Sequence, residues 1–218
     1  MLDRVQTAEA VRKSGLYLFL HRWISAGFAN ACRWQVHGWE HVPVQGPVIL
    51  ASNHLSNWDP VVLACAVRRP VHFMAKKELF AIPLIGSLIG DLGAFAVDRQ
   101  STGRQALKAS VAILEKGGVI GVFPEGTRSK TGALGEAKAG TALIALMAKT
   151  PIVPVGLYNT GRIFSGGRFQ SFAVEIGSPL PMDMTEGKKN TSQAAQQLTE
   201  QMMTAIEQLV EQGRQRLS

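Results

Sequence analysis

Between residues 40 and 176 the chain alternates between short apolar runs and longer segments whose apolar residues recur at helical spacing. A run such as VIGVF at 119–123 is apolar at successive positions, which is typical of a strand buried on both faces. The pattern predicts strands over 47–52, 71–75, 93–97, 119–123, 151–157 and 169–176, and helices over 60–67, 84–89 (or a turn), 103–115, 136–148 and 191–212. This alternation predicts an α/β fold with a mostly parallel central sheet flanked by helices.

The N-terminal segment, residues 1–38, has a different pattern from the α/β domain predicted over 39–218. Charged residues interrupt its apolar stretch, so no uncharged span reaches the ~20 residues that cross a bilayer. A helix over 14–36 would place Leu16, Phe19, Leu20 and Trp23 on one side. An aromatic helix with basic flanks is typical of an anchor that lies in the membrane plane. The alternative is a helix packed on its own domain.

The composition bounds the class of protein. The chain has 218 residues, 46% of them apolar and 18% charged, which fits one folded domain and excludes dominant disorder. Its two cysteines, Cys32 and Cys65, exclude a disulfide scaffold and a multi-cysteine zinc site. We therefore expect reduced thiols in a cytoplasmic setting and no bound metal.

The formal net charge of +7 calls for an anionic partner. Nucleic acid, an anionic membrane surface and a phosphorylated substrate would each serve. The basic residues are scattered as singles and pairs, with no block rich in lysine and arginine. This distribution argues against nucleic acid and favours recognition of a phosphate together with attraction to a membrane surface.

The loop after the first predicted strand carries a histidine and an aspartate, His54 and Asp59, five positions apart. On a regular helix five residues turn through about 500°, so the two side chains meet only if the loop folds back. A histidine held by a carboxylate is suited to act as a general base. The alternative is that Asp59 caps the helix opened by Pro60 and that His54 is a surface residue.

A second loop, 123–129, follows the predicted strand 119–123 and reads FPEGTRS. Gly121 and Gly126 have the spacing of a nucleotide-binding P-loop, but Thr127 stands where that motif requires lysine. The loop offers a glycine for close backbone approach, a hydroxyl group and Arg128, whose guanidinium can bind a phosphate in a bidentate manner. The alternative is a tight turn with an exposed glutamate and arginine.

Together the loops resemble the glycerolipid acyltransferases of the 1-acylglycerol-3-phosphate type, often called lysophosphatidic acid acyltransferases. The NHxxxxD box is matched by 53–59 and the FPEGTRS box by 123–129. Between them, 95–99 matches a short apolar run that ends in Asp-Arg, and 152–155 matches an apolar segment around a proline. The resemblance covers about residues 35–180, with the motifs in the family's order.

The resemblance implies a chemistry for these residues. His54 would take the proton from the sn-2 hydroxyl of a lysophosphatidate, and Asp59 would orient His54. The resulting alkoxide would attack the thioester of acyl-CoA or acyl carrier protein, which is a substrate, so that no cofactor and no metal are implied. The phosphate of the acceptor would be bound by Arg99, Arg128 and one of Lys76 and Lys77. The glycerol pocket would be lined by Glu125, Gly126 and Thr127.

The implied substrate and product are membrane lipids. We therefore expect a peripheral or monotopic protein at the cytoplasmic face of the inner membrane, in contact with anionic lipids. Two alternatives stay open: an acyltransferase with another lysophospholipid or polar lipid as acceptor, and a non-catalytic peripheral membrane protein.

Overall fold

The computed structural model describes residues 15–82, 85–97, 103–181 and 191–218. Its main sheet has seven strands in the order β1-β9-β6-β2-β5-β3-β4. The strands are β1 (Gln35–His37), β2 (Val48–Ser52), β3 (Val71–Lys76), β4 (Phe95–Val97), β5 (Val119–Val122), β6 (Ile152–Tyr158) and β9 (Ala173–Ile176). Strands β6, β2, β5, β3 and β4 run parallel, and β9 is antiparallel to β6. The predicted α/β fold with a mostly parallel sheet is thus confirmed.

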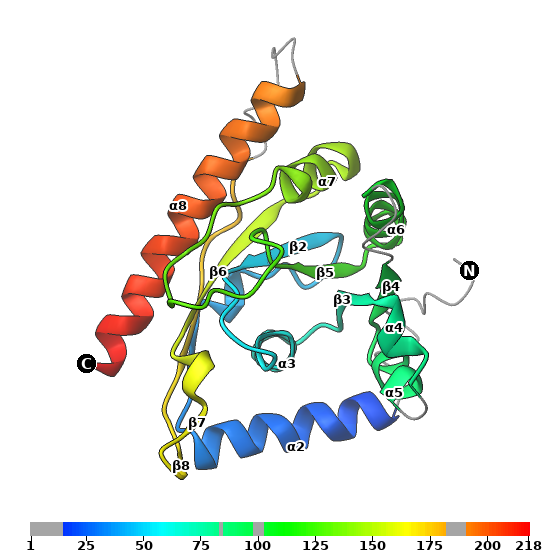
Figure 1. The fold of residues 1–218 in the computed structure, drawn as a ribbon. Helices are drawn as coiled ribbons and strands as arrows, with labels where there is room; N and C mark the ends of the chain where they lie inside the picture. Colours follow the sequence, from blue (N-terminus) through cyan, green and yellow to red (C-terminus); the bar gives the residue numbers. More distant parts are fainter. Residues whose placement is uncertain (1–14, 83–84, 98–102, 182–190) are drawn as a thin grey trace.

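Helices cover both faces of this sheet (Figure 1). They are α2 (Gly15–Ala31), α3 (Asp59–Ala66), α4 (Lys77–Phe80), α5 (Ile85–Asp91), α6 (Arg104–Glu115), α7 (Gly140–Ala148) and α8 (Thr191–Leu217), with short 3-10 turns η2 (Trp39–His41) and η3 (Thr160–Arg162). A separate hairpin consists of β7 (Phe164–Ser165) and β8 (Arg168–Phe169).

The core is divided by the sheet into two apolar clusters. Alternate residues of β2 point to opposite faces, so Leu50 packs with α2 and α3, whereas Ile49 packs with α6, α7 and α8. All residues of β2 and β5 are buried, as strands with helices on both faces require. This burial explains why their sequences read as continuous apolar runs.

The long helix α8 closes one face by lying directly on β6. A side chain at Gly156 would place its Cβ 2.5 Å from the backbone of α8, so glycine permits this close approach. Met202 and Ile206 of α8 are fully buried. Near the C-terminal end, Arg216 of α8 forms an ion pair with Glu175 of β9, with 2.6 Å between Nε and Oε1.

Several element boundaries differ from the prediction for reasons that lie elsewhere in the fold. The helix predicted over 14–36 ends at Ala31, because Gln35–His37 pair with β9 as β1. This strand precedes the domain boundary predicted after residue 38, so residues on both sides of that boundary build one sheet. The strand predicted over 169–176 is split into β8 and β9.

Helices α7 and α8 also differ from their predicted lengths. Helix α7 begins at Gly140 rather than 136, because the preceding residues hold the neighbouring loop: the Lys138 amide donates to the Pro124 carbonyl at 3.0 Å. Helix α8 continues to Leu217, beyond the predicted end at 212. These differences reflect contacts between segments that are distant in sequence.

Helix α2 packs on the domain through one side only. Tyr17 and Phe28 are buried, and Phe28 contacts Phe172 edge-on at 5.2 Å between ring centroids. Leu18, Phe19 and Trp23 remain 53%, 58% and 64% exposed. Within the described residues no helix is both long and apolar enough to cross a membrane. The packed-helix alternative therefore accounts for part of this segment, and its membrane association stays a prediction.

Candidate active site

The candidate site lies where neighbouring parallel strands end. His54 follows β2, Glu125 follows β5, Thr160 follows β6, and Lys76 is the last residue of β3. These four strands are adjacent in the order β6-β2-β5-β3. Because the carboxyl ends of parallel strands lie at one edge of the sheet, the topology gathers residues from four distant segments.

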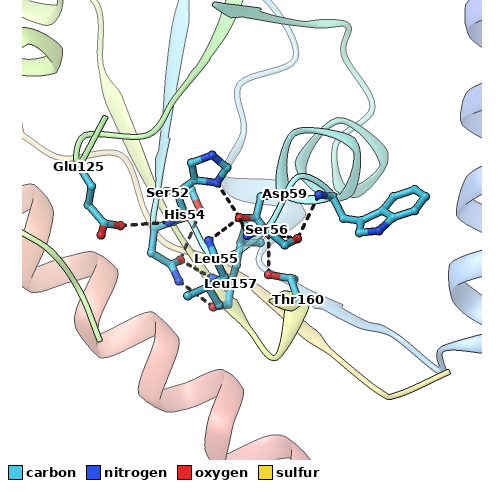
Figure 2. A network of polar contacts seen from close by, with 10 residues as sticks. Ser52, His54, Leu55, Ser56, Asp59, Glu125, Leu157 and Thr160 are labelled. Carbon is cyan, nitrogen blue, oxygen red and sulfur yellow. Dashed lines mark hydrogen bonds and ion pairs between the residues drawn. The ribbon is translucent and has the colours of Figure 1, made fainter. Parts of the chain in front are cut away.

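His54 and Asp59 are in direct contact. The loop between β2 and α3 folds back, and His54 Nδ1 lies 2.8 Å from Asp59 Oδ2 (Figure 2). The Asp59 side chain is fully buried, and that of His54 is 17% exposed. With the proton on Nδ1 donated to Asp59, Nε2 carries the free lone pair of the neutral ring. None of the hydrogen bonds among the described residues engages Nε2. The loop geometry predicted for this pair is therefore present.

Asp59 is fixed by donors on both carboxylate oxygens. Oδ2 also accepts the backbone amides of Leu55 at 2.5 Å and Ser56 at 2.7 Å. Oδ1 accepts the hydroxyl groups of Ser56 at 3.2 Å and Thr160 at 2.6 Å. Asp59 is the first residue of α3 and accepts amides that precede the helix, so it does not serve as the N-cap. The carboxylate instead holds the loop in the shape that brings His54 to it.

Asn53 anchors the same loop to the neighbouring strand. Its buried side chain donates to the Leu157 carbonyl at 2.9 Å and accepts the Leu157 amide at 2.8 Å. The Ser129 amide donates to the His54 carbonyl at 2.7 Å. Asn53 is therefore tied to β6, and the backbone of the adjoining His54 is tied to the loop that follows β5.

Glu125 connects the two sequence boxes. It is buried, and its carboxylate accepts the His54 amide at 3.0 Å and the Gly135 amide at 2.8 Å. A Cβ on Gly135 would lie 2.8 Å from Glu125 Oε2, so the backbone approaches as closely as glycine allows. In this position Glu125 holds the His54 backbone, and its contact with the glycerol of the acceptor stays a prediction.

Replacing Glu125 by glutamine is expected to destabilise the fold. A glutamine amide group would face one of the two N–H donors with a donor of its own, leaving a buried group unpaired at a cost of about 1–3 kcal/mol. Thermal unfolding should show a Tm lower by about 2–10 °C for a domain of this size. Glu136→Gln, at an exposed neighbouring position, is the matched control. An unchanged Tm for Glu125→Gln would contradict the role of this carboxylate.

The plane of the His54 ring is set by an aromatic stack. Its imidazole lies over Phe123 with 4.1 Å between centroids and 16° between planes, and Phe123 in turn stacks on Phe73 at 6.2 Å. The Phe73 ring occupies the place where Gly121 would carry a Cβ, only 2.1 Å from its nearest atom. Gly121, which has P-loop spacing in the sequence, therefore makes room for a ring rather than a phosphate.

The residues predicted to bind the acceptor differ in backbone conformation and exposure, and one of them lies outside the described residues. Gly126 has a left-handed φ of 69°, which favours glycine, and Thr127 and Arg128 beside it are exposed. Lys76 and Lys77 are exposed where β3 meets α4. Arg99 lies outside the described residues, two positions after the end of β4. Lys76 and Lys77 thus stand at the end of β3, and Arg128 stands in the loop after the neighbouring β5.

Thr160 is the site residue that the sequence did not indicate. Its hydroxyl reaches Asp59 across a separation of 101 positions. No motif or spacing marks this threonine, because its role arises from the adjacency of β6 and β2. The stacking of Phe123 on His54 was likewise not predicted, although Phe123 belongs to the FPEGTRS box.

The arrangement defines a class of chemistry. A neutral imidazole with Nε2 unengaged, oriented by a buried carboxylate, is suited to remove a proton from a hydroxyl group. In the neighbouring loop Arg128 is exposed, and a guanidinium group can bind an anionic group in a bidentate manner, so its contact with the substrate stays a prediction. An α/β domain with this centre is suited to transfer a group onto an alcohol.

The comparisons with known proteins identify the family. The chain belongs to the acyltransferase family, whose model matches residues 33–158. The 1-acyl-sn-glycerol-3-phosphate acyltransferase of Bacillus subtilis is 34% identical over 151 residues, covering 67% of this chain and 73% of the relative. The enzyme of the same name from Streptococcus pneumoniae is 32% identical over 182 residues, covering 82% of this chain and 67% of the relative.

A solved structure has the same fold. The crystal structure of the 1-acyl-sn-glycerophosphate (LPA) acyltransferase PlsC from Thermotoga maritima aligns with a TM-score of 0.75 at 25% sequence identity. The alignment covers 95% of this chain and 83% of that chain. The family resemblance seen in the sequence is thereby confirmed.

Proposed function

We propose that this chain transfers an acyl group from an acyl thioester to the sn-2 hydroxyl of 1-acyl-sn-glycerol-3-phosphate, forming phosphatidic acid. The observation that carries the proposal is the contact between His54 and the buried Asp59, at 2.8 Å, in a member of the acyltransferase family. The names of the relatives from Bacillus subtilis and Streptococcus pneumoniae support this acceptor.

His54 is the general base of the proposed reaction. Its Nε2 removes the proton from the acceptor hydroxyl as the oxygen attacks the thioester carbonyl. Asp59 keeps the proton of the neutral ring on Nδ1 and stabilises the imidazolium that forms. When the carbon–sulfur bond breaks, the imidazolium returns the proton to the departing thiolate. The products are the ester and a free thiol, and the step draws on no further reactant.

The cationic residues provide the proposed grip on the acceptor. Arg128 stands in the loop after β5, and Lys76 and Lys77 stand where β3 meets α4, so these three belong to the edge of the sheet that carries His54. Arg99 lies outside the described residues, and its part in binding the phosphate rests on the family resemblance. A bidentate arginine contact to the phosphate would place the glycerol between the cations and the base. Acyl-CoA and acyl carrier protein are both candidate donors.

Helix α2 is the proposed membrane contact at the cytoplasmic face of the inner membrane. Its exposed Leu18, Phe19 and Trp23 would enter the headgroup region while Tyr17 and Phe28 stay in the protein core. Deleting residues 1–36 would not be a clean test of this contact. Besides α2 it would remove part of β1 and the core residue Phe28, and so damage the fold.

The triple variant Leu18→Ser, Phe19→Ser, Trp23→Ser tests the anchor without touching the core. We expect the protein to stay folded and to move from the membrane pellet to the soluble fraction, because apolar burial in the bilayer contributes about 25 cal/mol per Å². Fractionation and thermal unfolding measure the two properties. A folded variant that sediments with membranes to the same extent as the unaltered protein would exclude this face of α2 as a membrane contact.

Thiol release tests the proposed activity. The purified protein is mixed with acyl-CoA or acylated carrier protein and a panel of lysophospholipids, and free thiol is measured. Release that requires lysophosphatidate is the expected result. Release with a different lysophospholipid would reassign the acceptor. No thiol release with either donor would contradict the proposed acyltransferase activity.

A further inference from the structure

The hairpin β7–β8 exposes two aromatic rings outside the main sheet. Phe164 and Phe169 pair across it, edge to face, with 5.3 Å between ring centroids. They are 64% and 55% exposed, although they sit together. The connecting Gly166 and Gly167 both have positive φ, as a two-residue hairpin turn of type I′ requires. The hairpin thus presents a small apolar patch, formed by Phe164 and Phe169, to solvent.

A basic hollow adjoins this apolar patch. It has a volume of about 430 Å³ and is lined by Asn159, Arg162, Ser165, Gly166, Arg168 and Gln170. Both arginines are exposed, and within the described part of the chain no ion pair engages either of them. The sequence contains no aspartate or glutamate from 137 to 174. The positive charge of the hollow is therefore not neutralised by its own segment.

The root of the hairpin is firmly held in the protein. Ile163 is buried, and its carbonyl accepts the Gln170 amide at 2.9 Å. Thr160, three residues earlier, is fully buried and donates to Asp59. The segment that leads into the hairpin is therefore hydrogen-bonded to Asp59, which connects the hairpin to the His54–Asp59 pair.

We propose that the hairpin is a second membrane contact, in which Phe164 and Phe169 enter the interface while Arg162 and Arg168 bind the phosphate of an anionic bilayer lipid. Guanidinium groups bind phosphate in a bidentate manner, and aromatic rings beside basic residues suit the boundary between headgroups and acyl chains. The combination matches a bilayer because it offers an apolar and an anionic partner side by side. This inference goes beyond the proposed reaction and does not depend on the acceptor.

Vesicle binding by the full chain tests the charge component. Phosphatidylcholine vesicles with and without phosphatidylglycerol are the probes, and sedimentation is the readout. Arg162→Gln with Arg168→Gln should weaken binding to the anionic vesicles about tenfold or more, since each basic residue near such a surface contributes about a fivefold factor. Arg104→Gln with Lys108→Gln, which removes the same charge from α6, is the matched control and should bind within about twofold of the unaltered protein, because α6 packs on the opposite face of the sheet from α2.

An environment-sensitive dye on Phe164→Cys tests whether the hairpin itself reaches the membrane. Cys32 is buried, and burial raises the pKa of the Cys65 thiol, so the introduced thiol is the most reactive one. We expect the emission to shift to the blue when phosphatidylglycerol vesicles are added, and to stay unchanged with inorganic phosphate alone. The same dye on Lys108→Cys should not shift.

Three outcomes would overturn the proposal. In the first, the dye at position 164 keeps its aqueous emission while the protein sediments with vesicles, which would leave α2 as the contact. In the second, the hairpin variant and the α6 control bind equally. In the third, acyl carrier protein shifts the dye and vesicles do not, which would assign the hairpin to a protein partner. None of these readouts measures acyl transfer, so they stand apart from a failure of the proposed activity.

Discussion

His54→Ala is expected to lower kcat for acyl transfer by about 10²–10⁴-fold, the usual contribution of a general base. The fold should survive, because Asp59 keeps its bonds to the Leu55 and Ser56 amides and to the Thr160 hydroxyl. The loss of the stack on Phe123 should cost about 1 kcal/mol of the free energy of unfolding. Thiol release and thermal unfolding measure the two effects.

The matched control is His41→Gln. His41 contacts the Ile176 carbonyl through Nδ1, at 2.8 Å, and belongs to the segment after β1 rather than to the site edge. This variant should retain kcat within about twofold, even if its stability falls. Retention of most of the activity in a folded His54→Ala protein would remove His54 from the role of base.

Comparing the asparagine and alanine variants of Asp59 is expected to separate its two roles, which are stabilising the His54 imidazolium and holding the loop. Asparagine keeps an oxygen for the amides of the loop, and its NH₂ group can donate to the hydroxyls of Ser56 and Thr160, which also accept. The loop should therefore hold, while the negative charge that stabilises the imidazolium is lost. We expect kcat to fall by about 10²-fold or more with a stability change of about 1 kcal/mol.

Asp59→Ala removes every one of these acceptors. The part-buried Leu55 and Ser56 amides and the buried Thr160 hydroxyl lose their partner, and at about 1–3 kcal/mol per unpaired group the free energy of unfolding should fall by about 3 kcal/mol or more. Denaturant unfolding measures this difference. Equal stability of the two variants would show that the carboxylate does not hold the loop.

A double variant of His54 and Asp59 tests whether the two residues act together in the reaction. If Asp59 works only through His54, then adding Asp59→Asn to His54→Ala should leave the residual kcat unchanged. A further loss of tenfold or more in the double variant would mean that Asp59 has a role of its own in the reaction. Ser56→Ala is the mild control, since it removes the 3.2 Å hydroxyl contact to Asp59 and leaves the Ser56 amide in place.

Much of this site was readable because its motifs are local. The box at 53–59 contains both members of the His–Asp pair, and the fold needs only one loop to bring them together. The FPEGTRS box was assigned to substrate contact. In the structure Glu125 accepts the His54 backbone amide, and Phe123 stacks on the His54 ring. A buried carboxylate and a stacked ring have no signature in sequence spacing, because their partners come from other segments.

The sequence by itself determined the alternation of strands and helices, the mostly parallel sheet and the family, and through the family resemblance it predicted the pairing of His54 with Asp59. These properties follow from the periodicity of apolar residues and from motifs a few residues long, which act within one element or one loop. Only the tertiary structure decided that β1 joins the sheet, that Thr160 reaches Asp59, and that Glu125 connects the His54 and Gly135 amides. Each of these depends on which strands become neighbours, and that order is set by the packing of the whole core.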